Sequence, residues 1–141
     1  MLDGKELLYG EVSREQLFFD YPHWQYIYDE YEAGEKIIDS LAISKMEIDV
    51  EIFFGTWCGD SRRDVPRFYK VLDESDFTSE NKVKLYAVNR KKKLKNELAE
   101  KRKIQRVATF IFYKKQKEIG RIVEYPHISL ENDILDIINK N

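Results

Sequence analysis

The sequence has few of the residues that build covalent or metal cross-links. Its 141 residues include one cysteine, two histidines, three prolines and six glycines. A single cysteine excludes an internal disulfide. It also argues against a thiolate zinc site, because such sites need several Cys or His ligands at short spacing. His23 and His127 are too far apart in sequence to form a metal motif. We therefore expect neither a metal nor another cofactor.

Long apolar runs and an excess of one charge are also absent. No run approaches the roughly 20 apolar residues that span a bilayer, and the first ten residues, MLDGKELLYG, have neither the basic nor the apolar part of a secretory signal. The 24 basic and 26 acidic residues leave a net charge of -2, which gives no general attraction to nucleic acid or anionic membranes. We expect a soluble, cytoplasmic monomer or weak dimer that binds neither.

The first third of the chain has helical patterns. Ser13 and Gln16 have the spacing of a capping box and are predicted to begin a short helix. Two further helices are expected, at 23–33 and 35–43, with apolar and aromatic residues recurring at intervals of three and four. Residues 1–46 are therefore predicted to form a helical extension packed on the rest of the protein.

From residue 47 onward, strand patterns alternate with helix patterns. IDVEIFF, residues 48–54, is rich in β-branched and aromatic residues and is typical of a strand buried on both faces. The order β-α-β-α-β-β-α predicts one α/β domain over 47–141, with a mixed sheet of about four strands flanked by helices. The other expected elements are helices at 60–72, at 93–103 and after Ser129, and strands at 83–88, 109–114 and 118–125.

The single cysteine, Cys58, lies in GTWCGDSRRDVP, where the first of these strands meets a helix. Unpaired backbone N–H groups and the helix dipole at such a position favour the thiolate. Arg62 and Arg63 add positive charge nearby, Asp60 opposes it, and Ser61 is expected to donate a hydrogen bond to the sulfur. The alternative is a buried, inert cysteine. The polar neighbours favour an exposed, reactive one.

These features resemble the thioredoxin superfamily over about residues 47–141, and in particular a group of small bacterial thioredoxin-like proteins. W-C-G-x-x follows the first strand, as in that family. Pro66 matches the proline that bends the family's active-site helix. Val107 and Ala108, in the segment RVAT, match the loop that faces the cysteine.

The sequence departs from the family pattern at three positions. Ser61 replaces the second, resolving cysteine, Ala108 replaces the cis-proline, and Ile52 takes the place of the buried acid that assists proton transfer. We expect a trans Val107–Ala108 peptide, because a cis bond that does not involve proline costs about 2.5–4 kcal/mol. Without a second cysteine the protein cannot close the internal disulfide of an ordinary thioredoxin.

The resemblance implies two functions. In the first, Cys58 forms mixed disulfides with protein or small-molecule thiols and disulfides, by thiol–disulfide exchange or deglutathionylation, and a separate thiol resolves them. Ser61 would assist, and the substrate would contact Trp57, Gly59, Asp60, Val107 and Ala108, with the Val107 backbone pairing to an extended peptide. Trp57 alternatively serves only as partly buried packing. In the second, the domain is a protein-binding module without redox turnover.

The basic run RKKKLK, Arg90–Lys95, invites a nucleic-acid interpretation. Acidic residues follow it at Glu97 and Glu100, and the run has no aromatic residue on which a base would stack. A solvated helical face is the better interpretation. Because the loop before Ala108 lies near the cysteine in the expected fold, this charge can attract acidic partners or the carboxylates of a glutathione-like thiol.

Overall fold

A computed structural model of the chain describes residues 8–44 and 47–141. The expectation about a secretory signal falls mainly on residues 1–7, outside the described residues. The centre of the fold is a five-stranded mixed sheet in the order β1-β3-β2-β4-β5. Only β2 and β3 are parallel. The strands are β1 (Gly10–Val12), β2 (Ile48–Phe54), β3 (Val83–Ala87), β4 (Thr109–Lys114) and β5 (Lys117–Val123).

The expected α/β fold is confirmed, with one strand more than the sequence indicated. The additional strand, β1, lies in the predicted helical extension and pairs antiparallel with β3, from Gly10 opposite Ala87 to Val12 opposite Leu85. Three residues are too short for an alternating pattern to be recognised, and pairing with a strand about 75 residues away defines this element.

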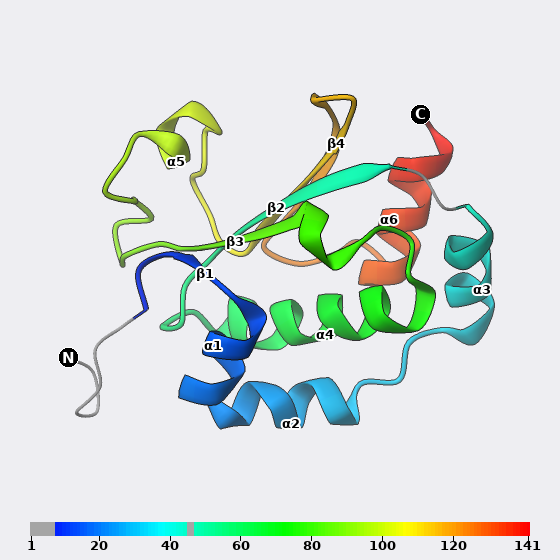
Figure 1. The fold of residues 1–141 in the computed structure, drawn as a ribbon, viewed down its shortest axis with the longest axis horizontal. Coiled ribbons are helices and arrows are strands. Elements are labelled where there is room, and N and C mark those ends of the chain that lie inside the picture. Colours follow the sequence, from blue (N-terminus) through cyan, green and yellow to red (C-terminus); the bar gives the residue numbers. More distant parts are fainter. Residues whose placement is uncertain (1–7, 45–46) are drawn as a thin grey trace.

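Helices cover the two faces of the sheet unequally (Figure 1). Helices α1–α4 and α6 lie on one side, and the short α5 lies on the other with its flanking turns. None of the described helices is long and apolar enough to cross a membrane. The helices are α1 (Arg14–Asp20), α2 (Pro22–Glu30), α3 (Glu35–Ile43), α4 (Gly59–Ser75), α5 (Leu98–Lys101) and α6 (Leu130–Asn139), with a 3-10 turn at Glu80–Lys82.

Two apolar clusters fill the space on either side of β2. The larger cluster is formed by residues of α4, α6 and the extension together with alternate residues of β2, which are Ile48, Val50, Ile52 and Phe54. Phe53 points to the opposite face, into a smaller cluster formed with Val88, Leu94, Ala99, Val107 and Ile111. One face of β2 is therefore buried along its whole length, whereas the other is buried at Phe53 and only half-buried at Asp49 and Glu51. The expected burial on both faces is thus correct only for the end of the strand.

The predicted helix at 93–103 is wrong in extent, because only Leu98–Lys101 is helical. The segment before it is organised by Asn89, whose side-chain oxygen accepts the backbone N–H groups of Lys91 (2.9 Å) and Lys93 (3.1 Å). Asn side chains stabilise turns in this way and compete with helix formation. The basic run therefore forms turns, and it does not form the predicted helical face.

Arg14 joins the extension to α4 and the turn that follows it. Its guanidinium forms two hydrogen bonds to Asp73, at 2.6 and 2.8 Å, pairs with Glu80, and lies over the ring of Tyr69. The Tyr28 hydroxyl donates to the same Asp73 carboxylate at 2.6 Å. These contacts hold α1 and α2 against the outer face of α4.

Candidate functional site

Cys58 lies at the N-cap of α4, after the tight turn that follows β2. Its backbone N–H donates to the Gly55 carbonyl at 3.1 Å, and its own carbonyl accepts the N–H of Arg62 at 3.0 Å. The Cys58 side chain is half-buried, and among the residues that the structure describes no side chain caps the first turn of α4. Cys58 therefore lies between a strand and the start of a helix, as the sequence predicted.

The loop before β4 faces the cysteine. The Cys58 thiol donates to the Val107 carbonyl at 3.4 Å. The predicted trans Val107–Ala108 peptide is wrong, since this bond is cis. The prediction considered only the local preference, whereas both residues are buried and the Ala108 carbonyl accepts the N–H of Glu124 at 2.8 Å. Tertiary contacts of this kind can outweigh a local preference.

Ser61 has a different partner from the one expected. The prediction gave its hydroxyl a hydrogen bond to the sulfur, but its oxygen accepts the backbone N–H of Gly55 at 3.1 Å. The side chain is fully buried below the turn that carries the cysteine. The serine therefore ties the start of α4 to the end of β2, and it positions Cys58 through the backbone.

Trp57 is half-buried and packs against the smaller apolar cluster. Its indole N–H donates to the Val88 carbonyl at 3.1 Å, just beyond the end of β3. A Cβ atom at Gly55 would lie 2.4 Å from the Trp57 ring, so the ring needs a glycine beneath it. The packing role considered for Trp57 is present, and its indole forms one border of the cysteine site.

Charged side chains surround the cysteine, and most of them are paired. Arg63 bonds both Asp64 (2.9 Å) and Asp60 (3.1 Å), and the hydrogen bond to Asp64 is the main reason that the pKa of Arg63 is raised. Arg62 is exposed and forms no ion pair with any described residue. Only one of the two arginines expected to favour the thiolate is therefore available to it.

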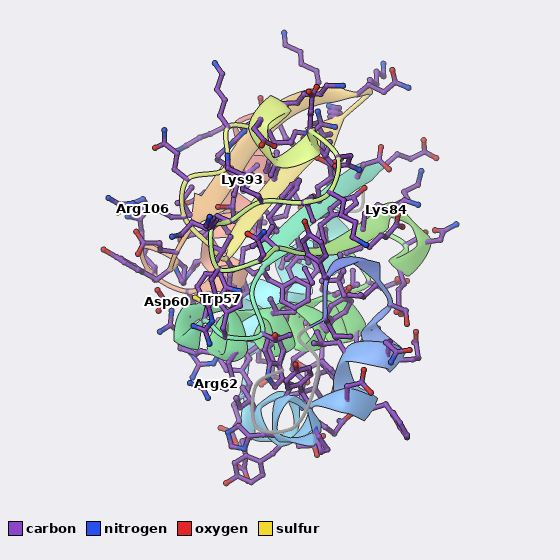
Figure 2. All side chains as sticks on the ribbon, turned by 90° about the vertical axis from the view of Figure 1, so that its left-hand side faces the viewer. Trp57, Asp60, Arg62, Lys84, Lys93 and Arg106 are labelled. Atoms are coloured by element: carbon purple, nitrogen blue, oxygen red, sulfur yellow. The ribbon has the colours of Figure 1, made fainter. Side chains whose placement is uncertain are left out.

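Two further cations reach the site from the basic run, which the sequence could not place. Arg90 and Lys92 each lie 5.9 Å from the centre of the Trp57 ring. In Figure 2, which views this end of the molecule, Lys84 is labelled well apart from Trp57 and Asp60. The signal in the sequence was the charge of the run, but its position over Trp57 depends on the Asn89 turn.

No carboxylate lies behind the sulfur at the position that Ile52 occupies. Ile52 is fully buried and is paired with Leu85 on β3 and Phe110 on β4. Across residues 8–44 and 47–141, no group of three or more His, Cys, Asp and Glu side chains is arranged to hold a metal ion.

The α5 side of the sheet also carries a polar groove that the sequence did not indicate. It has a volume of about 430 Å³ and includes Glu51, Tyr86, Arg102 and Tyr113. Glu51 accepts hydrogen bonds from both Arg102 and Tyr113, at 2.6 Å each. Burial and that carboxylate raise the pKa of Tyr113. The groove is lined by β2, β3 and β4, and Cys58 is not among its residues.

Comparison with known proteins gives one family and several related structures. The family described as Thioredoxin matches residues 19–133, which includes only the end of α1 but all of α2 and α3. A thioredoxin-like protein of Acanthamoeba polyphaga mimivirus is 29% identical over 84 residues, which are 60% of this chain and 58% of that protein. The match thus spans little more than half of the relative's length.

Two solved thioredoxins illustrate the structural similarity. Thioredoxin from Fasciola hepatica is 26% identical, with a TM-score of 0.45, over 75% of this chain and 88% of the other. The reduced thioredoxin pre-protein of Schistosoma mansoni is 25% identical, with a TM-score of 0.47, over 78% and 93% respectively.

Proposed function

The chain belongs to the thioredoxin family, and on that basis we propose that it is a monothiol thioredoxin-like protein that forms mixed disulfides through Cys58. The proposed chemistry is thiol–disulfide exchange, including the removal of glutathione-type adducts. We place it in the cytoplasm, where small thiols are available to complete the reaction. The proposed substrate surface consists of Trp57, Gly59, Asp60 and the Val107–Ala108 loop.

The observation that supports this most directly is the position of the sulfur at the N-cap of α4. The N–H groups of the first turn have no carbonyl partner within the helix, and no side chain of residues 8–44 or 47–141 caps them. They favour the thiolate, which is the nucleophilic form of cysteine. Ionisation also releases the thiol from the Val107 carbonyl, which frees that carbonyl for a substrate backbone.

The reaction needs a thiol from outside the chain. The Cys58 thiolate attacks one sulfur of a disulfide R–S–S–R′, forms Cys58–S–S–R and expels R′–S⁻. A separate thiolate R″–S⁻ then attacks the R sulfur, releases R–S–S–R″ and restores the Cys58 thiolate. The two steps exchange one thiolate for another, so no further oxidant is needed. Ser61 contributes as a positioning residue through Gly55.

A second candidate is a redox-inactive module that binds proteins through the same surface. Arg63 favours this candidate, because its charge is held by Asp60 and Asp64 and is not free to stabilise a thiolate. The two candidates differ in whether Cys58 ever exchanges with a disulfide.

Intact mass spectrometry after incubation with oxidised glutathione distinguishes them. We expect the natural protein to gain one glutathionyl group, which excess reduced glutathione removes, and Cys58→Ser to gain none. If the folded protein gains no adduct while Cys58 is alkylated normally in urea, the redox proposal fails and the binding module remains.

Ser61→Cys extends the same experiment to the missing second thiol. Residues 58 and 61 are one helical turn apart, so we expect both thiols to be lost on mild oxidation, as a disulfide forms. The variant should then reduce insulin disulfides with dithiothreitol, modestly, because Ile52 cannot relay a proton. Insulin reduction by the natural protein at the same rate would contradict the monothiol mechanism.

A further inference from the structure

We propose that the basic turn at residues 89–93 makes Cys58 selective for disulfides whose sulfur is flanked by carboxylates. This inference rests on the proposed function and names the substrate class of the same site. Oxidised glutathione and the disulfides of acidic peptides both have carboxylates near the sulfur, and the experiment below separates these two sources.

The turn is fixed relative to the cysteine by hydrogen bonds. The Trp57 indole is anchored to the Val88 carbonyl, and Asn89 follows directly. The Asn89 backbone N–H donates to the Lys93 carbonyl at 3.0 Å, and its carbonyl accepts the N–H of Lys92 at 2.8 Å. The side chain of Asn89 adds two more bonds to the same turn. The cations beside Trp57 are therefore presented from a defined turn.

Besides the exposed Arg62, two cations beside Trp57 remain available to a ligand, Arg90 and Lys92. Both lie over the Trp57 ring, and neither forms an ion pair with any residue in 8–44 or 47–141. Three other cations of the region are committed to carboxylates. These pairs are Lys93 with Glu100, Arg106 with Glu124, and Arg63 with Asp60 and Asp64.

The balanced net charge of the chain conceals two regions of opposite charge. Residues 90–106 contain nine Lys and Arg residues and two Glu, whereas residues 8–44 contain eight Asp and Glu residues and two basic ones. The basic segment lies on the α5 side of the sheet, and the acidic helices lie on the opposite side (Figure 1). A negatively charged disulfide is therefore attracted toward the side of the molecule that carries Trp57 and repelled from the extension.

The attack itself strengthens this preference. Exchange moves negative charge from the attacking sulfur to the leaving sulfur, and carboxylates beside these sulfurs would oppose that charge in water. Arg90 and Lys92, each 5.9 Å from the centre of the Trp57 ring, offset this repulsion. Salt screens such attraction over a Debye length of about 10 Å at 0.1 M. The preference must therefore weaken as salt is added.

Two small disulfides of different charge test the proposal. Dithiobis(nitrobenzoate) carries two carboxylates, dithiodipyridine carries no charge at neutral pH, and both release a coloured thiol when Cys58 attacks. We expect the ratio of anionic to neutral rate constants to exceed that of free N-acetylcysteine. In Arg90→Gln/Lys92→Gln the ratio should fall about three- to tenfold, and high salt should reduce it similarly in the natural protein.

Lys84→Gln provides a matched control for the loss of a positive charge. Lys84 is on β3, 54% exposed, and lies apart from Trp57 in Figure 2. The rate ratio should not change in this variant. Circular dichroism and a thermal melt confirm that each variant is folded.

The possible results separate this inference from the proposed function. If neither probe reacts with folded Cys58, the proposed function itself fails. If both probes react but the double variant leaves the ratio unchanged, the function stands and the selectivity is overturned. Oxidised glutathione and Glu-flanked or Lys-flanked peptide disulfides then identify the source. If the double variant reacts more slowly than the natural protein with oxidised glutathione or with the Glu-flanked peptide, the proposal is supported. If its rate is unchanged with both, the proposal is overturned.

Discussion

Gly55 shows how much of the site depends on one residue. The Trp57 ring lies directly over its Cα, and a Cβ atom there would be 2.4 Å from Cε2 and 2.6 Å from Nε1 of the indole. Both distances are far below van der Waals contact, so an added methyl group must displace the ring. The same residue donates its N–H to Ser61, which limits movement of the backbone in response.

We therefore expect Gly55→Ala to displace Trp57 and to lower the free energy of unfolding by about 1–3 kcal/mol, in the range measured for overpacked sites. Tryptophan fluorescence and urea denaturation measure the two effects. Gly59→Ala is the matched control, because its added Cβ would meet only the end of the Arg62 side chain at 3.7 Å. Equal fluorescence changes in both variants would show that the ring does not depend on Gly55.

At the scale of elements, a turn at 89–93 leads into a segment that is helical only at Leu98–Lys101, where the sequence predicted a helix over 93–103. Asn89 accepts two backbone N–H groups, from Lys91 and Lys93. Leu94 is buried in the smaller apolar cluster beyond the turn and fixes its far end. The position of Arg90 and Lys92 over Trp57 is thus a property of the turn as a whole.

Asn89→Ala should loosen this turn without unfolding the domain. We expect a loss of about 1–2 kcal/mol in stability from two missing hydrogen bonds and faster amide exchange at Lys91 and Lys93. Hydrogen exchange followed by NMR measures this directly. Asn96→Ala removes a single bond, to the N–H of Leu98, and its effect should remain at α5. Unchanged protection at Lys91 and Lys93 would contradict the role given to Asn89.

At the scale of the whole molecule, the extension and the domain are joined through a carboxylate whose pKa is shifted. Burial alone would raise the pKa of Asp73, but hydrogen bonds from Arg14 and Tyr28 lower it below its ordinary value of 3.8. Burial and the same carboxylate raise the pKa of Tyr28 to about 12. A carboxyl group with a lowered pKa stabilises the folded state above its unfolded pKa, and the contribution is lost as the pH falls through the folded pKa.

We expect Asp73→Asn to lower the free energy of unfolding by about 1–2 kcal/mol at neutral pH, since the hydrogen bonds to charged Asp73 are only partly shielded from solvent. The difference from the natural protein should shrink as the pH falls below about 4. Urea denaturation across this range tests it. Glu74→Gln, on the same helix and exposed, should show little difference at any pH. A constant effect of Asp73→Asn at all pH values would exclude the charge as its cause.

The sequence by itself determined the elements with strong local signals. Strand β2 and helix α3 have the predicted bounds, and Ser13 and Ser129 cap helices as expected. The position of Cys58 between a strand and a helix also followed from the sequence. These features depend on periodicity and on contacts within one helical turn. Both are set by residues that are close together in the sequence.

The tertiary structure decided the features that join distant residues. Local preferences do not describe the packing on which four of these features depend. They are the strand β1, the cis bond before Ala108, the Ser61–Gly55 hydrogen bond and the Trp57–Val88 contact. The near-zero net charge was read correctly from composition, yet only the fold separates acidic helices from the basic turn. Charge acts over distances in space, and the sequence contains only distances along the chain.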